Sequence, residues 1–146
     1  SSDLAKDYVR MMWMILQADK PEDWVIATGK TETVREFVRM SFEYVGITLE
    51  FKGEGVNEKA FVKECKNIEY QLEIGQEVLS IDPSYFRPTE VDLLIGDPSK
   101  AKEKLGWTTD YDLNDLVDDM MDSDLKLMKK HKLLEEKGYN VIKKHE

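Results

Sequence analysis

Only three short segments of this chain carry a strand pattern, and helical or highly charged stretches separate them. These segments are residues 24–27, 47–51 and 77–81. A sheet of three strands has two open edges and needs other elements to cover its apolar face. The pattern therefore predicts a mixed α/β fold, with a small sheet of about three or more strands packed against helices.

Apolar residues at helical spacing predict four helices along the chain. Thr33 caps the second helix, and Asp97 caps the third, with Pro98 in its first turn. The stretch 56–76 is highly charged, and we interpret it as a long loop containing one helical turn or a short strand. The four helices are expected at residues 4–18, 34–45, 98–105 and 113–131, and Gly138 is expected to end a further helical turn.

The first predicted helix is apolar around more than one face. Tyr8, Met11 and Ile15 lie on the face that a small core can use. The apolar side chains off that face are Val9, Met12, Trp13 and Leu16. Because exposed apolar patches mark interaction sites, we expect this helix to contact a partner, and the isolated chain to self-associate through it.

Length and charge limit the possible functions. A chain of 146 residues is expected to form one domain, residues 1–146, which is too short for a complete two-domain cofactor enzyme. The net charge of −9 argues against nucleic acid and membranes as partners. No apolar run approaches the roughly 20 residues that span a bilayer. The single cysteine, Cys65, and the lack of a visible signal peptide favour a cytoplasmic location.

Most possible catalytic patterns in the sequence are weak. The chain has no GxGxxG fingerprint and no phosphate-binding P-loop. The two histidines, His131 and His145, lie near the C-terminal end, and one cysteine with two such histidines does not make a zinc site. Tyr139 and Lys143 form a Tyr-x-x-x-Lys pair, but they lie in a polar tail, and we interpret the pair as accidental. We therefore predict no catalytic or metal-ligating residue.

The most informative local signal surrounds Arg87, one of four arginines in a lysine-rich chain. Its planar guanidinium can hold two oxygens of a diphosphate, which a lysine cannot do in the same way. Glu90, three residues later, can accept hydrogen bonds from ribose hydroxyls. The plain alternative is a surface Arg–Glu pair in a turn, which contributes little energy. Arg87 and Glu90 are the candidate substrate-binding residues.

Several runs together resemble the C-terminal part of GDP-mannose 4,6-dehydratases, which are extended short-chain dehydrogenase/reductases. The resemblance covers nearly the whole chain, and its tail is similar to the end of a bacterial member. The matching runs are residues 5–9, 21–29, 34–38, 53–56, 82–92 and 96–107, together with 129–134 and 138–139.

The resemblance implies a reaction in which NADP oxidises C4 of GDP-mannose, water leaves across C5–C6, and GDP-4-keto-6-deoxymannose forms. It also implies that Arg87 contacts the GDP diphosphate and that Glu90 contacts the ribose. The nucleotide-binding Rossmann half of that family has no counterpart here, and neither has its Arg-Asp-Trp-Gly run before Ala5. We therefore expect this chain to be a substrate-binding part that, by itself, is inactive and binds no NADP. Its expected partners are the Rossmann half and further copies of the protein in a homo-oligomer.

Two other functions stay open at this point. The chain could be an acidic α/β interaction module without catalysis, whose Met-rich helix binds another protein. It could also belong to a different nucleotide-sugar enzyme, such as an epimerase or another dehydratase. Titration with GDP-mannose and with UDP-glucose would separate the enzymes from each other.

Overall fold

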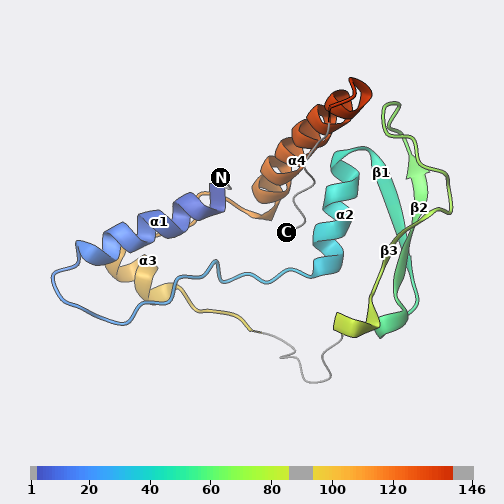
Figure 1. Ribbon diagram of the computed structural model, residues 1–146. Coiled ribbons are helices and arrows are strands. Elements are labelled where there is room, and N and C mark those ends of the chain that lie inside the picture. The colour runs from blue at the N-terminus through green and yellow to red at the C-terminus, as the bar shows by residue number, and fades with distance from the viewer. Residues whose placement is uncertain (1–2, 86–93, 140–146) are drawn as a thin grey trace.

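The computed structural model describes residues 3–85 and 94–139, whose helices and strands form two regions joined by α4 (Figure 1). We call α2 and the three strands the sheet region. We call α1, α3 and the segments packed on them the helical region. The mixed α/β class predicted from the sequence is confirmed. The elements are α1 (Asp3–Leu16), α2 (Val34–Tyr44), β1 (Ile47–Lys52), η1 (Gly55–Asn57), β2 (Lys59–Cys65), β3 (Glu77–Ser80), η2 (Pro83–Tyr85), α3 (Ser99–Leu105) and α4 (Leu113–Glu136).

The sheet has the strand order β1-β2-β3, and both pairs are antiparallel. The strands predicted at 47–51 and 77–81 are confirmed to within one residue. The stretch 56–76, predicted as a long loop containing one helical turn or a short strand, has both the turn η1 and a strand, β2, and is irregular from residue 66 onward; that β2 is the central strand of the sheet was not predicted. Charged residues at both ends of β2 hid a short period-two pattern, in which Ala60 and Val62 face the core.

The strand predicted at 24–27 is also wrong. This segment is irregular, and no ladder joins it to another segment that the structure describes. An apolar β-branched run becomes a strand only when a neighbouring strand pairs with its backbone. The segment instead lies against Gly96, where an added Cβ would come within 2.6 Å of the Ala27 Cβ. Only glycine allows the two segments to approach this closely.

The core of the sheet region is formed by β1, β2 and α2. Its buried side chains come from the strands, and Val38 and Phe42 of α2 pack against them. Thr33 caps α2 as predicted, because its hydroxyl accepts a hydrogen bond from the Glu36 amide at 3.1 Å. The buried set is Ile47, Leu49, Ala60 and Val62.

The core of the helical region is smaller, and distant parts of the chain form it. Met11 of α1, Ala101 of α3 and Trp107 are buried together. Around them lie the partly buried side chains of Met14, Ile15, Trp24, Ile26 and Leu105. The side chains expected off this face of α1 are exposed, as predicted, namely Val9, Met12, Trp13 and Leu16.

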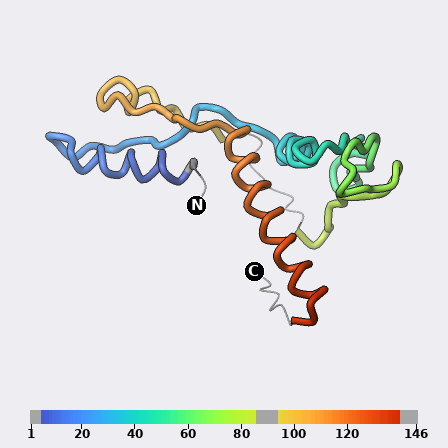
Figure 2. Tube along the Cα trace, turned by 90° about the horizontal axis from the view of Figure 1, so that it is seen from above, coloured from blue at the N-terminus to red at the C-terminus, as the bar shows by residue number. Residues whose placement is uncertain are grey.

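The ends of α3 and α4 follow most of their sequence signals. Gly106 closes α3 in the left-handed conformation, at φ 67°. The predicted cap of α3 at Asp97 is wrong by one residue: Pro98 is the N-cap and no side chain caps this helix, although the Asp97 carboxylate accepts a hydrogen bond from the Ser99 amide. α4 runs without a break to Glu136, so the helical turn predicted before Gly138 is part of the same helix as residues 113–131. Figure 2 shows α4 leaving the layer in which the two regions lie side by side.

Candidate functional site

The predicted substrate-binding residues, Arg87 and Glu90, lie outside the described residues, so their roles stay predictions. The chain on either side of them is held by aspartate turns. Asp82 accepts a hydrogen bond from the Ser84 amide at 2.8 Å, and this bond lowers the pKa of the Asp82 carboxyl. On the other side, the Asp97 pKa is lowered by hydrogen bonds from the hydroxyl and the amide of Ser99.

Those two turns belong to different regions of the molecule. Asp82 immediately precedes η2, which follows the last strand of the sheet region, whereas Asp97 precedes α3 of the helical region. The segment that carries Arg87 and Glu90 is therefore the covalent connection from the sheet region to α3. Tyr85 and Leu94, the described residues at its two ends, are both exposed.

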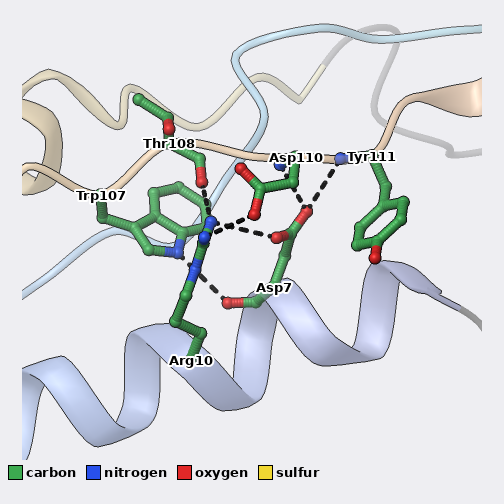
Figure 3. A network of polar contacts seen from close by, with 6 residues as sticks. All are labelled: Asp7, Arg10, Trp107, Thr108, Asp110 and Tyr111. Carbon is green, nitrogen blue, oxygen red and sulfur yellow. Dashed lines mark hydrogen bonds and ion pairs between the residues drawn. The ribbon is translucent and has the colours of Figure 1, made fainter.

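The buried carboxylate of Asp7, on α1, is hydrogen-bonded to distant parts of the chain (Figure 3). Its Oδ2 accepts hydrogen bonds from the backbone amides of Asp110, at 3.0 Å, and Tyr111, at 3.2 Å. Its Oδ1 accepts a bond from Arg10, and its backbone carbonyl accepts the Trp107 indole N–H at 3.2 Å. We call these contacts the Asp7 network.

Arg10 extends the Asp7 network toward solvent. Its guanidinium donates to the Thr108 carbonyl and pairs with the Asp110 carboxylate, so it joins α1 to the segment between α3 and α4 (Figure 3). The Arg10 Nε is buried and has no hydrogen-bond partner in the described structure. The network fixes the chain just before α4, because four of its six residues lie in 107–111.

The Asp7 network borders a cleft of about 350 Å³, one wall of which carries Thr109, Tyr111 and the first turn of α4. Thr28, Lys30 and Glu32, which precede α2, line the other wall. These hydroxyl, ammonium and carboxylate groups can bind a polar molecule. They do not include a nucleophile held against a base, so the cleft is a candidate binding surface rather than a catalytic centre.

The first turn of α4, beside this cleft, is closed by a capping box. Asp112 accepts hydrogen bonds from the amides of Asp115 and Asn114, at 3.2 and 2.8 Å. The Asp115 carboxylate accepts the Asp112 amide in return. These bonds, with that from the Asp115 amide first, lower the pKa of the Asp112 carboxyl. The amides at this helix end are therefore already partly satisfied by the chain itself.

Other possible sites give little within residues 3–85 and 94–139. No group of three or more His, Cys, Asp and Glu side chains there is arranged to hold a metal ion. Tyr139 is exposed, and Lys143 lies outside the described residues, so the structure does not test that pair. None of the helices described is both long and apolar enough to cross a bilayer.

Sequence reasoning did not identify the Asp7 network. A signal for it was present, because Asp7 lies one helical turn before the buried Met11 on the same face of α1. A lone carboxylate on the buried face of an apolar helix needs hydrogen-bond donors. Nothing in the sequence indicates that these donors lie about 100 residues away, in Asp110 and Tyr111.

Comparison with known proteins gives a consistent result over almost the whole chain. A profile of the family described as GDP-mannose 4,6 dehydratase matches residues 3–120. The chain is 51% identical to GDP-mannose 4,6-dehydratase of Yersinia enterocolitica over 94% of its length and 37% of that relative. It is 50% identical to the Vibrio cholerae protein of that name over 94% of the chain and 37% of the relative. It is 46% identical to the human GDP-mannose 4,6 dehydratase over 86% of the chain and 31% of that protein. The chain thus spans about a third of the length of the relatives it matches.

Proposed function

Because the chain belongs to the GDP-mannose 4,6-dehydratase family, as its motifs predicted, we propose that it is the GDP-sugar-binding part of such an enzyme. The observation that carries this proposal is the family match over residues 3–120, which includes the whole segment around Arg87 and Glu90. The parent protein would convert GDP-mannose into GDP-4-keto-6-deoxymannose, as a cytoplasmic lyase of the extended short-chain dehydrogenase/reductase type. We propose that the present chain contributes its C-terminal domain, residues 1–146, and acts in a homo-oligomer.

The proposed division of work follows from the chemistry of two side chains. The Arg87 guanidinium holds two oxygens of the diphosphate with parallel, charge-assisted hydrogen bonds. The Glu90 carboxylate accepts hydrogen bonds from the ribose hydroxyls. Both contacts orient the nucleotide and leave the sugar free to reach the reacting groups. Pro88 supports this geometry, since the residue before a proline is biased toward an extended backbone.

The position of the segment supports the same proposal. It connects the sheet region to α3, and the turns at Asp82 and Asp97 hold the chain on both sides of it.

The described residues do not fit NADP. A dinucleotide site needs a glycine-rich turn that leads from a strand into a helix N-terminus. Gly46 and Gly106, both with positive φ, instead follow the ends of α2 and α3. Gly29 precedes α2 but lacks the other glycines of the fingerprint. We therefore propose that NADP binds to a Rossmann half of the parent protein, and we derive no step through it.

The experiment is calorimetric titration of GDP into the protein that carries this chain, comparing Arg87→Lys with Glu90→Gln. We expect Arg87→Lys to weaken GDP binding by about one to two decades, because lysine loses one bond to a charged group worth about 1.5–3 kcal/mol. We expect Glu90→Gln to weaken it less, since glutamine keeps one acceptor. If Arg87→Lys binds GDP like the parent, Arg87 is a structural turn residue and the assignment is wrong.

A second function, that of an interaction module without catalysis, is favoured by one observation. The exposed apolar side chains of α1 form a surface that no described residue covers. In our proposal the Rossmann half of the parent covers this surface. Titration with GDP-mannose and UDP-glucose separates the functions, since an interaction module binds neither, an epimerase for UDP-sugars binds the second, and the proposed dehydratase binds the first.

A further inference from the structure

The predicted substrate-binding residues, Arg87 and Glu90, stand between two parts of the chain that are held separately. Before them, Tyr85 ends η2, which follows β3. After them, Gly96 packs closely against Ala27, in the irregular segment that leads into α2. The contacts that fix the start of α2 on the sheet therefore help to set the distance between the two ends of the segment that carries Arg87 and Glu90.

One such contact is an ion pair between α2 and the connection from β1 to β2. Arg35, in the first turn of α2, donates a hydrogen bond from its Nε to the Glu58 Oε1 at 2.5 Å. The Arg35 guanidinium also lies 5.9 Å from the centre of the Phe51 ring, on β1. The Glu58 side chain is 14% exposed, and the hydrogen bond from Arg35 lowers the pKa of its carboxyl. The ion pair holds the β1–β2 connection against the first turn of α2.

The backbone carries this contact from Glu58 to the neighbouring strand. Gly53 has a φ of 88°, and a Cβ there would come within 2.4 Å of a carbonyl oxygen in the same connection, so the connection closes tightly. Lys59, which follows Glu58, is paired with Ser80 in the β2–β3 ladder, at the end of the sheet where β1 also ends (Figure 1). Ser80 stands two residues before Asp82, whose carboxylate holds the next turn. The start of α2 and the turn that leads to Tyr85 are thus linked through one ion pair and one pair of strand residues.

Other contacts already hold α2 on the sheet core. Val38 and Phe42 pack against the strands, and Thr33 caps the first turn of α2. An ion pair whose arginine is 58% exposed adds little to the free energy of unfolding. The main consequence of the pair is geometric, because it fixes where the first turn of α2 meets the end of the sheet.

We propose that Arg35 and Glu58 are positioning residues for GDP binding, and that their ion pair sets the spacing between the two ends of the segment from which Arg87 acts. This inference rests on the proposed function, because it takes Arg87 as the residue that holds the diphosphate. Arg35 and Glu58 act through the segment and do not contact the nucleotide. Breaking the pair should therefore weaken GDP binding while the sheet region stays folded.

The test is calorimetric titration of GDP into the protein that carries this chain, with the ion pair broken from either side. Glu58→Gln keeps the shape of the side chain and removes its charge, and Arg35→Gln removes the charge of its partner. We expect each substitution to weaken GDP binding about threefold to tenfold. Arg35→Lys keeps a positive charge and should retain most of the affinity that Arg35→Gln loses.

A double-mutant cycle with Arg87→Lys shows whether the pair acts through Arg87. In the Arg87→Lys background, Glu58→Gln should weaken GDP binding less than about twofold, because the contact that the pair positions is already impaired. The matched control is Glu43→Gln, which breaks an ion pair of Arg39 further along α2 and should leave GDP binding unchanged.

The results separate a failure of this inference from a failure of the proposed function. If Arg87→Lys weakens GDP binding and Glu58→Gln does not, only the positioning role is wrong. That role is also wrong if Glu58→Gln has its full effect in the Arg87→Lys background, or if Arg35→Lys loses as much affinity as Arg35→Gln. If Arg87→Lys itself leaves GDP binding unchanged, the proposed function fails, and this inference fails with it.

Discussion

The two regions of the molecule close their cores in different ways. In the sheet region, antiparallel strands near one another in the chain pair, and α2, which directly precedes them, covers their face. In the helical region, Asp7 bonds to Asp110 and Tyr111, about 100 residues away. Local contacts cost little chain entropy, whereas long-range contacts form only after a large loop is closed. The helical region therefore depends more strongly on a few specific bonds.

The two regions also differ in what they leave exposed. α1 turns a row of large apolar side chains outward, Trp13 and Leu16 among them, while its opposite face packs on α3 and Trp107. The buried core of the sheet region is the larger of the two that are described. We infer that the sheet region is the more self-sufficient part, and that the helical region is where further protein surface binds.

The largest effect on this comparison is expected from Asp7→Ala. The substitution leaves the amides of Asp110 and Tyr111 without their acceptor and removes a partner of Arg10. We expect a loss of about 3 kcal/mol, confined to the helical region. Hydrogen exchange should show lost protection in α1 and α3 and retained protection in β1 and β2.

Asp19→Ala is the control for that substitution, because Asp19 is an exposed aspartate just after α1. It should leave exchange unchanged in both regions. A uniform loss of protection in the Asp7→Ala chain would mean that the two regions unfold as one unit. That result would contradict the claim that the helical region depends on its own specific bonds.

Local sequence rules predicted the sheet region well, apart from β2. The cap at Thr33 and the strands β1 and β3 follow from residue-by-residue preferences. The central position of β2 was missed because Lys59, Lys63 and Glu64 give this strand a polar composition, and only its pairing on both sides shows that it is the central strand. Strand character here is a property of the sheet more than of the segment.

Sequence reasoning could predict the candidate site only through chemistry that is local in the chain. Arg87, Pro88 and Glu90 form a short motif, and their roles remain predictions. The Asp7 network could not be predicted, because it joins α1 to the segment before α4. Nothing in the sequence of either segment indicates that the other is its partner. The strand predicted at 24–27 failed for the related reason that a strand requires a partner.

A cavity in the sheet region should have the next largest effect. Val62→Ala removes two methyl groups from the buried core and should cost about 2 kcal/mol of unfolding free energy. Protection should fall in β1–β3 and hold in α1. Lys63→Ala, an exposed neighbour on the same strand, should change little. Equal loss of protection in α1 would indicate that its stability depends on the sheet region.

Polar substitutions on the exposed face of α1 should change association rather than stability. Trp13→Gln with Leu16→Gln removes apolar surface without touching a core, so we expect less than about 0.5 kcal/mol of change in stability. Self-association through α1 should weaken, as measured by light scattering at high concentration. Val34→Gln is a matched control in the sheet region, since Val34 and Leu16 are both 80% exposed. If Val34→Gln weakens self-association as much as the α1 substitutions do, α1 is not the surface through which the chain associates.

The smallest expected effect distinguishes the caps of two helices by pH. A hydroxyl, Thr33, caps α2, and a carboxylate with a lowered pKa, Asp112, caps α4. A lowered pKa means that the folded state favours the charged form, so this contribution is complete above the ordinary value of about 3.9 and is lost as pH falls through the lower folded value. NMR should therefore show the first turn of α4 fraying in acid before that of α2. Asp112→Asn keeps an acceptor that does not titrate, so the α4 cap should then be insensitive to pH. Fraying that persists unchanged in Asp112→Asn would mean that another carboxylate, such as Asp115 of the capping box, controls this helix end.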